Sequence, residues 1–201
     1  MILVGSKNPH KLHEVRAILE PLGMRAVIAV DLPDVVEDGD TFAANAAKKA
    51  GEFAMFLKAP CLADDSGLVI PALNGEPGIY SARYAGEDAT DEQNLQKVLQ
   101  RLADEGLEQP EAYFQCSIAI AVPTITGPEI VVETEGRVEG RIVHAPRGEH
   151  GFGYDPIFLL PELGVTTAEL PPEEKNRLSH RAAALQKLAK KLPEIRHRLE
   201  P

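Results

Sequence analysis

The first third of the chain alternates between short apolar runs and amphipathic helical segments, and this alternation restricts the fold to few classes. Residues 1–4 and 27–30 are apolar runs typical of strands, whereas residues 12–22 place their leucine, valine and isoleucine side chains on one helical face. The alanine-rich segment 41–57 predicts a second helix, and residues 59–63 predict a further buried strand. Strands that alternate with helices in this way are typical of an α/β sheet.

The middle of the chain favours a β-ribbon. Residues 113–122 and 129–143 have the composition of strands and are joined across Thr126, Gly127 and Pro128, after an amphipathic helix predicted at 91–102. We therefore predict an α/β fold in which a mixed β-sheet is flanked by helices. We expect one domain over residues 1–201, with two lobes and a central active-site cleft between them.

The start of the last helix can be placed in two ways. Ser179 is a good N-cap residue, which would put His180 and Arg181 in the first turn of the helix. Alternatively, the helix begins at Pro172, where two following glutamates would interact favourably with the helix dipole and His180 would be interior. The spacing of the residues does not separate these interpretations.

The charge balance argues against a polyanionic partner. The chain has 31 acidic and 21 basic residues, a net charge of -10, whereas nucleic-acid binders usually carry basic patches. No apolar stretch approaches the length of a membrane span, and no signal peptide is expected before the first strand. Cys61 and Cys116 lie in apolar runs without metal-ligand spacing, so two reduced thiols are expected. These features predict a cytoplasmic protein that binds neither nucleic acid nor a membrane.

Two adjacent carboxylates, Asp64 and Asp65, follow the apolar run 59–63. We expect Gly67 to end this strand, and a solvated turn is the simplest interpretation of the segment. However, two neighbouring anions repel each other, and Mg²⁺ prefers one or two carboxylates together with water and phosphate. Successive strand residues point to opposite faces, so we expect one aspartate to face the cleft while the other supports it.

Basic residues gather where the first helix is expected to begin. Asn8 would cap this helix and Pro9 would be its first residue. Cations at the positive end of a helix are unfavourable unless an anion lies nearby. The sequence lacks a Walker A motif there. We nevertheless predict a phosphate-binding loop, in preference to a solvated surface, formed by Ser6, Lys7, Asn8, Pro9, His10 and Lys11.

The second helix can place a cation close to the aspartate pair. Asn45 and Lys49 are four residues apart and share one helical face. Lys49 could neutralise phosphate charge near the two aspartates, and Glu37 could be a further metal ligand. Each of these residues could also be a surface salt-bridge partner.

Together these segments resemble the inosine/xanthosine triphosphate pyrophosphatase family over nearly the whole chain. Six motifs occur in the family's order: Ser6-x-Asn8-x-x-Lys11, Glu37-x-Gly39-x-Thr41-Phe42-x-x-Asn45-Ala46-x-x-Lys49-Ala50, Ala63-Asp64-Asp65-Ser66-Gly67-Leu68, Pro77-Gly78-Ile79-Tyr80-Ser81-Ala82-Arg83, Gly151-Phe152-Gly153-Tyr154-Asp155-Pro156-Ile157-Phe158 and Lys175-Asn176-x-x-Ser179-His180-Arg181.

The resemblance implies a homodimer that hydrolyses ITP, dITP and XTP to the monophosphate and pyrophosphate, with one or more Mg²⁺ ions per subunit. Asp65 would be the general base and would hold the metal together with Glu37, while Asp64 and Lys49 would assist. The loop of residues 6–11 would bind the phosphates, and Ser66 would also contact the substrate. The resemblance implies that Phe152 would stack on the purine and that Gly153, Tyr154 and Asp155 would complete this wall of the site. The residues that would read the edge of the base are Lys175, His180 and Arg181.

One position departs from the family pattern. The family usually has glutamate where this chain has Ala44, and that glutamate would complete a capping box with Thr41. Its absence should weaken the helix start by about 1 kcal/mol at most. Two alternatives to the main interpretation are a pyrophosphatase of the same fold with another base preference and a non-catalytic module that senses nucleotides.

Overall fold

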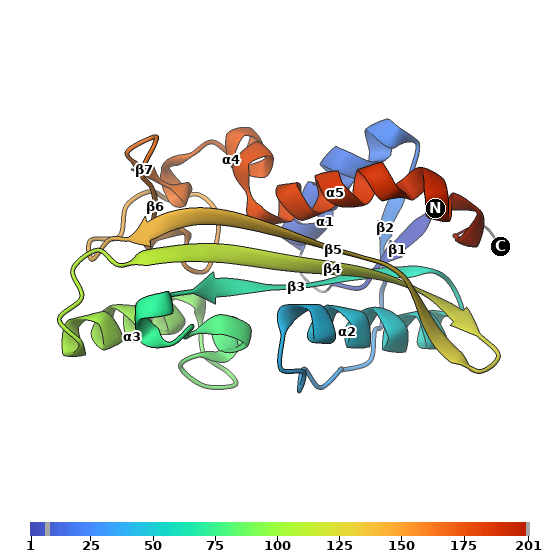
Figure 1. The fold of residues 1–201 in the computed structure, drawn as a ribbon, viewed down its shortest axis with the longest axis horizontal. Helices are drawn as coiled ribbons and strands as arrows, with labels where there is room; N and C mark the ends of the chain where they lie inside the picture. The colour runs from blue at the N-terminus through green and yellow to red at the C-terminus, as the bar shows by residue number, and fades with distance from the viewer. Residues whose placement is uncertain (7–8, 200–201) are drawn as a thin grey trace. The chain divides into compact units, whose positions relative to one another are not determined.

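The computed structural model describes residues 1–6 and 9–199 of the chain (Figure 1). Its strands are β1 (Ile2–Val4), β2 (Ala26–Ile28), β3 (Cys61–Val69), β4 (Glu111–Thr124), β5 (Gly127–Ile142), β6 (Phe158–Leu160) and β7 (Val165–Thr166). Its α-helices are α1 (Pro9–Leu19), α2 (Phe42–Leu57), α3 (Asp91–Asp104), α4 (Pro172–Leu178) and α5 (His180–Ile195).

The strands form one mixed sheet in the order β2-β1-β3-β4-β5-β6-β7. β1 is parallel to both β2 and β3, whereas β6 is antiparallel to β5 and β7. The prediction of an α/β fold with a mixed sheet and flanking helices is therefore confirmed. Cys61 and Cys116 are both free and buried, as expected.

The chain divides into two compact units. The first comprises Met1–Asp65, Cys116–Gly136 and His180–Pro201, and the second comprises Ser66–Gln115 and Arg137–Ser179. The active-site cleft expected between two lobes stays a prediction.

In the first unit, α1 and α5 cover one face of the sheet and α2 covers the other (Figure 1). The α1 and α5 side has a core of large aliphatic residues, among them Leu19, Leu185 and Leu188. On the other side, Ala46 and Ala50 of α2 pack in a cluster rich in alanine. Two apolar faces of the sheet are thus buried by helices that the sequence predicted.

The second unit has its own core beneath α3. Leu95, Val98 and Leu102 of this helix are buried with Phe114 and Phe158, whose ring centroids are 4.4 Å apart. A complete capping box starts the helix, because Thr90 and Gln93 exchange side-chain and backbone hydrogen bonds.

The start of α2 is simpler. Thr41 is its N-cap and accepts a hydrogen bond from the backbone N–H of Ala44. Ala44 has no side chain that can return this bond, so the capping box is incomplete, as the sequence predicted.

The prediction that a turn at Gly67 ends the third strand is wrong. β3 continues to Val69, so Asp64, Asp65 and Gly67 all lie within it. A close approach explains this glycine, because a Cβ there would lie 2.3 Å from Ser81 Oγ and 2.6 Å from the carbonyl oxygen of Gly78. Gly67 therefore allows the 78–81 segment to pack against the strand.

Gly67→Ala should lower the free energy of unfolding by about 1–3 kcal/mol, because the added methyl group overlaps backbone that is fixed in place. Urea titration of the variant against the wild type measures this difference. Equal midpoints and slopes would show that the 78–81 segment moves aside freely.

Each interpretation of the last helix is partly right. A helix does begin at Pro172, but it ends at Leu178, and α5 begins at His180. Ser179 separates the two helices with an extended backbone, at φ −73° and ψ 155°. His180 is therefore the first residue of α5 and is not interior to a longer helix.

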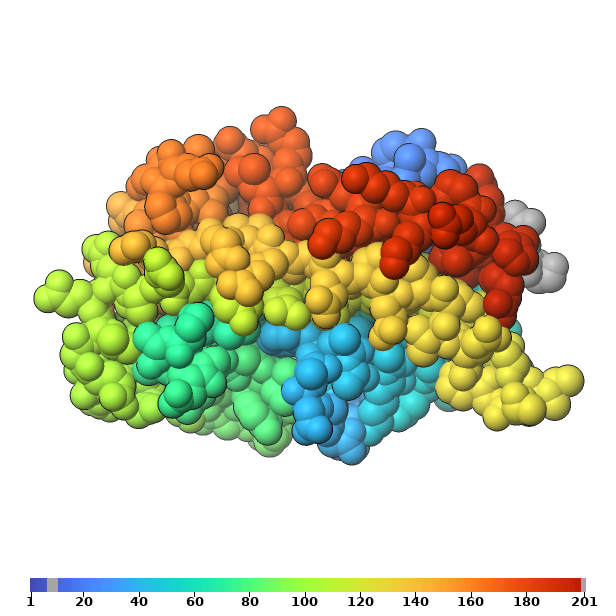
Figure 2. Space-filling view, viewed as in Figure 1, coloured from blue at the N-terminus to red at the C-terminus, as the bar shows by residue number. Residues whose placement is uncertain are grey.

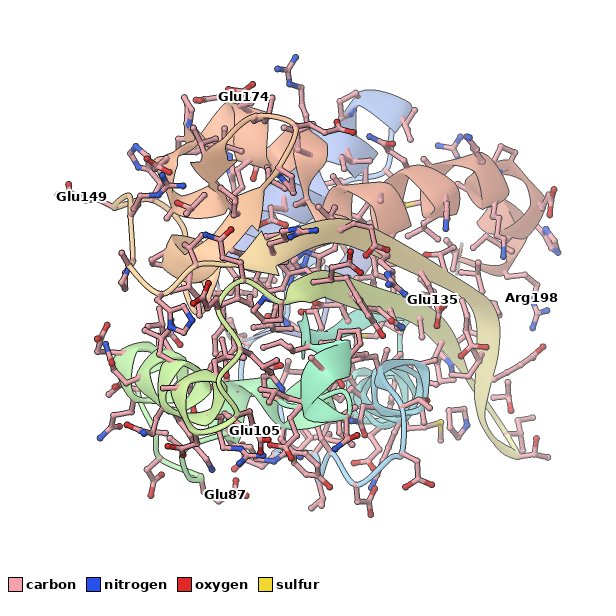
Figure 3. All side chains as sticks on the ribbon, turned by 60° about the vertical axis from the view of Figure 1, so that its left-hand side comes forward. Glu87, Glu105, Glu135, Glu149, Glu174 and Arg198 are labelled. Atoms are coloured by element: carbon pink, nitrogen blue, oxygen red, sulfur yellow. The ribbon has the colours of Figure 1, made fainter. Side chains whose placement is uncertain are left out.

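Acidic side chains and the β4–β5 turn lie at the surface. The turn between β4 and β5, at residues 125–126, projects from the molecule in Figure 2, and the side chain of Ile125 in it is fully exposed. Glu87, Glu149 and Glu174 point away from the ribbon in Figure 3. Within residues 1–6 and 9–199, no helix combines the length and the apolar composition needed to cross a bilayer.

Candidate active site

β3 presents the two aspartates to different helices. Asp64 contacts Lys11 of α1, at 2.9 Å, and Arg181 of α5, at 3.0 Å. Asp65 instead contacts Asn45 and Lys49 of α2. Because α1 and α5 lie on one face of the sheet and α2 on the other, the alternation expected of strand residues is observed (Figure 1).

Three predicted residues come together on the α2 side. Lys49 Nζ lies 3.0 Å from Glu37 Oε2 and 3.6 Å from Asp65 Oδ1. These side chains come from the loop before α2, from α2 itself and from β3. The Glu37–Lys49–Asp65 cluster thus places two carboxylates around one ammonium group.

Burial and charge set the protonation of this cluster. Burial would lower the pKa of Lys49, but the carboxylates of Asp65, Asp64 and Glu37 raise it above its ordinary value. Lys49 therefore stays charged at neutral pH. Burial, assisted by the negative charge of Glu37, raises the pKa of Asp65 above its ordinary value although Lys49 opposes this. A carboxylate of raised pKa is a better proton acceptor.

The same cluster fits a hard divalent cation. Glu37 and Asp65 both contact Lys49 Nζ and offer only carboxylate oxygens, the donor type that Mg²⁺ prefers. In the described part of the chain, no group of three or more His, Cys, Asp or Glu side chains is arranged to hold a metal. Mg²⁺ usually keeps several waters or takes substrate phosphates, so two protein ligands are sufficient.

On the other face of the sheet, Arg181 is at the centre of a buried ion network. Its guanidinium donates to Glu14 at 2.8 Å and twice to the same oxygen of Asp64, Oδ2, from Nε at 3.2 Å and from Nη2 at 3.0 Å. Arg181 is 1% exposed, and Asp64 also pairs with Lys11. Two cations thus balance two carboxylates in the interior.

Glu14 is a residue that the sequence analysis missed. A signal was present, because Glu14 lies three residues after Lys11 and directly before Val15, within the buried stripe of α1. A glutamate in such a stripe needs a cationic partner, and Arg181 is that partner. The resemblance assigns Arg181 to the base edge, which stays a prediction, whereas its contacts here are with the protein's own carboxylates.

Asp64→Asn should flatten the acid dependence of stability. Burial alone raises the pKa of Asp64, but the charges of Lys11, Arg181 and Lys49 outweigh it and hold that pKa well below its usual range. A carboxyl with a lowered folded-state pKa stabilises the fold above its unfolded value of about 3.9 and loses this effect as the pH falls further.

The wild type should therefore lose stability from about pH 5 downward. The variant should be less stable at neutral pH and should lose less on acidification. Urea unfolding at a series of pH values measures both slopes, and parallel slopes would contradict the assignment.

In the second unit, Asp155 organises the segment assigned to the purine. One of its carboxylate oxygens accepts from the backbone N–H of Phe152 at 2.8 Å and from Lys175 Nζ at 2.5 Å. The other accepts from the Thr167 hydroxyl at 2.8 Å. Lys175 Nζ also lies 4.8 Å from the centre of the Phe152 ring. Phe152, Asp155 and Lys175 are thus brought together, as the motifs suggested.

The neighbouring residues of this segment are anchored as well. The backbone N–H of Gly153 donates to Asp91 at 2.8 Å, and the Tyr154 hydroxyl donates to the carbonyl of Ser81 at 2.7 Å. Tyr154 is buried, so its ring is part of the core of the second unit.

The remaining predicted residues are placed as follows. Lys7 and Asn8 lie outside the described residues, and α1 begins at Pro9 as expected, with His10 next. Ser6 is half-buried directly before them, and Ser66 is half-buried within β3.

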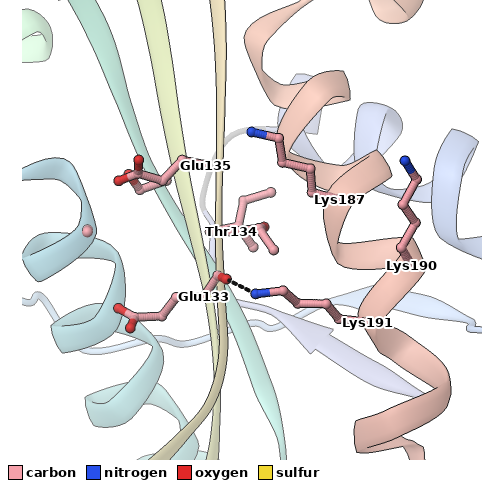
Figure 4. A pocket seen from close by; sticks show the side chains of 9 residues that line it. Glu133, Thr134, Glu135, Lys187, Lys190 and Lys191 are labelled. Atoms are coloured by element: carbon pink, nitrogen blue, oxygen red, sulfur yellow. Dashed lines mark hydrogen bonds between the residues drawn. The ribbon is translucent and has the colours of Figure 1, made fainter.

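A separate pocket of about 560 Å³ in the first unit contains none of the predicted site residues (Figure 4). Polar side chains line it, among them Glu133, Thr134 and Glu135 of β5 and Lys187, Lys190 and Lys191 of α5. Lys191 Nζ donates to the backbone carbonyl of Glu133 at 3.1 Å, which ties α5 to β5.

Comparison with known proteins shows which family the chain belongs to. Residues 2–191 match the model of the Ham1 family. The chain belongs to the Ham1 family. A relative from Geobacillus kaustophilus, named dITP/XTP pyrophosphatase, is 49% identical over 197 residues, which cover 96% of this chain and 95% of the relative. A protein of the same name from Bacillus subtilis is 45% identical over 193 residues, covering 94% and 96%.

A solved Ham1 structure shares the fold. The HAM1 protein from Coxiella burnetii superposes with a TM-score of 0.87 at 43% identity, over 96% of this chain and 98% of that one. The family resemblance derived from the six motifs is therefore confirmed.

Proposed function

We propose that this Ham1 protein hydrolyses deaminated purine nucleoside triphosphates (dITP, ITP and XTP) to the monophosphate and pyrophosphate, with Mg²⁺ as cofactor. The Glu37–Lys49–Asp65 cluster carries the proposal, because it combines a proton acceptor, a cation-binding pair and an ammonium group within one site. The names of the relatives, dITP/XTP pyrophosphatase, support this choice of substrate.

Glu37 and Asp65 would hold the Mg²⁺ ion, which when bound neutralises phosphate charge and fixes the phosphates in place. The residues of the chain supply the proton transfer and the remaining positive charge. Asp65 accepts a proton from the attacking water, whose oxygen bonds to the α-phosphorus. The α–β bridging oxygen then leaves as part of pyrophosphate.

Two lysines would take up the charge of this leaving group. Lys49 is charged and lies beside Asp65, and Lys11 pairs with the adjacent Asp64; each lysine also acts electrostatically on the other aspartate. Positive groups fixed before the reaction stabilise developing negative charge without the cost of reorganisation. Asp64 thus acts through Lys11 and Arg181.

Base selection would rest on Phe152 and Lys175. The Phe152 ring offers a stacking surface, and Lys175 beside it is a donor that suits the 6-oxo group of hypoxanthine or xanthine. Adenine carries a donor at that position, so its binding would leave two donors facing each other.

In this proposal the protein acts on the free nucleotide pool of the cytoplasm, and it forms the homodimer that the resemblance implies.

A panel of ITP, dITP, XTP, ATP and GTP, assayed with Mg²⁺ for pyrophosphate release, tests the function. We expect kcat/KM for the deaminated nucleotides to exceed that for ATP by about 100-fold or more. Preference for a pyrimidine or another modified base would favour the alternative specificity. Binding of nucleotide without hydrolysis of any triphosphate would favour a sensing module.

A further inference from the structure

Helices α2 and α3 begin with the same pattern, Thr-x-x-x-Asn. Thr41 and Thr90 are the N-cap residues, and each side chain accepts from the backbone N–H three residues later. Asn45 and Asn94 both occupy the fourth helical position and are 0% and 2% exposed. The two asparagines therefore have matching positions, one in each unit of the chain.

Each asparagine fastens a nearby loop to the start of its helix. Asn45 Oδ1 accepts from the backbone N–H of Gly39 at 2.8 Å, and Asn94 Oδ1 accepts from that of Ala85 at 2.7 Å. The fit at Gly39 is tight, because a Cβ there would lie 2.7 Å from Asn45 Oδ1. Both bonds satisfy buried polar groups and are of the kind that stabilises a fold.

The two asparagines differ in the acceptor of the amide group. Asn94 Nδ2 donates to the carbonyl of Ala82 at 3.1 Å. Asn45 Nδ2 donates instead to Asp65 Oδ2 at 3.0 Å. An amide has a donor end and an acceptor end, so the bond to Gly39 fixes which end faces the carboxylate.

We propose that Asn45 is a positioning residue that holds the carboxylate of Asp65 in a fixed orientation relative to Glu37. Glu37 lies two residues before Gly39, in the loop that Asn45 fastens, and both carboxylates contact Lys49. Metal ligands depend on hydrogen bonds from their neighbours for orientation. The inference rests on the proposed function, which assigns Asp65 and Glu37 to the cation.

Asn45→Ala and Asn94→Ala are a matched pair of variants. Each removes a buried amide that bonds twice, so both should lower the unfolding temperature to a similar extent. Only Asn45→Ala should weaken the binding of Mn²⁺ to the nucleotide-free protein, by about 10- to 100-fold, as measured by electron paramagnetic resonance of the free ion. The kcat for dITP should fall over the same range while KM stays close to that of the wild type.

Wild-type Mn²⁺ affinity and kcat in a folded Asn45→Ala protein would overturn the inference. Equal losses of Mn²⁺ affinity and kcat in Asn45→Ala and Asn94→Ala would also overturn it, because lowered stability would then explain both variants. If Asn45→Ala does not fold, Asn45→Ser is measured in the same way, since its shorter side chain cannot reach both partners. The same loss of affinity is expected for it.

The two proposals fail differently. If the wild type binds Mn²⁺ but hydrolyses no triphosphate, the proposed function is wrong, and the comparison of Mn²⁺ affinities still decides the role of Asn45. A wild-type protein that binds no Mn²⁺ would contradict the ligand assignment and the inference together.

Discussion

Asp65→Asn should lower kcat by about 1,000-fold or more while the protein stays folded, because the amide can neither accept the proton from water nor serve as an anionic ligand. The substitution keeps the shape of the side chain within β3, and its amide oxygen can still accept from Asn45. Pyrophosphate release from dITP measures the loss, and circular dichroism melting checks the fold.

Asp38→Asn is the matched control for this experiment. Asp38 is an exposed neighbour of Glu37 that pairs with Lys48 at 2.6 Å. A surface pair of this kind contributes little, so the control should keep its activity and its melting temperature. Near-normal turnover by Asp65→Asn would show that the base has been assigned to the wrong residue.

Arg181→Ala should have the largest effect on stability, with a loss of about 3–5 kcal/mol. Removal of the guanidinium takes away the cation that both Asp64 and Glu14 contact, and only Asp64 keeps a paired cation, Lys11. A buried charge without a partner lowers the free energy of unfolding. Because Arg181 is only 1% exposed, water cannot replace its guanidinium beside the two carboxylates. Urea unfolding at neutral pH measures the difference.

Arg198→Ala serves as the control, since Arg198 pairs with Glu129 at the surface. Its loss should cost less than about 1 kcal/mol. If Arg181→Ala were as stable as the control and changed only the ratio of ITP to ATP hydrolysis, then the guanidinium would read the base and the buried network would be incidental.

Local patterns predicted most of the elements. The apolar periodicity of 12–22 and 41–57 located α1 and α2, and the strand-like runs located β4 and β5. Each of these segments buries one side, so the spacing of its apolar residues indicates whether it is a helix or a strand. The order of the six motifs is likewise sufficient to identify the family.

Contacts between distant segments could not be predicted in the same way. The local sequence at Gly67 predicts a turn, whereas the actual role of this glycine depends on Ser81, which packs on the strand and is distant in the sequence. The burial of Arg181 depends on Glu14, 167 residues earlier in the chain. Spacing predicts that Asp64 and Asp65 point to opposite faces but does not say which residue faces which helix. The contacts with Lys11 and with Lys49 supply that information.

Phosphorus NMR of dITP incubated with the protein and Mg²⁺ tests the central claim most directly, because it identifies which anhydride bond is cleaved. The account predicts that pyrophosphate and dIMP appear in equal amounts at the expense of dITP, and that dATP remains largely intact over the same time. Release of inorganic phosphate with dIDP, or equal cleavage of dATP, would contradict it.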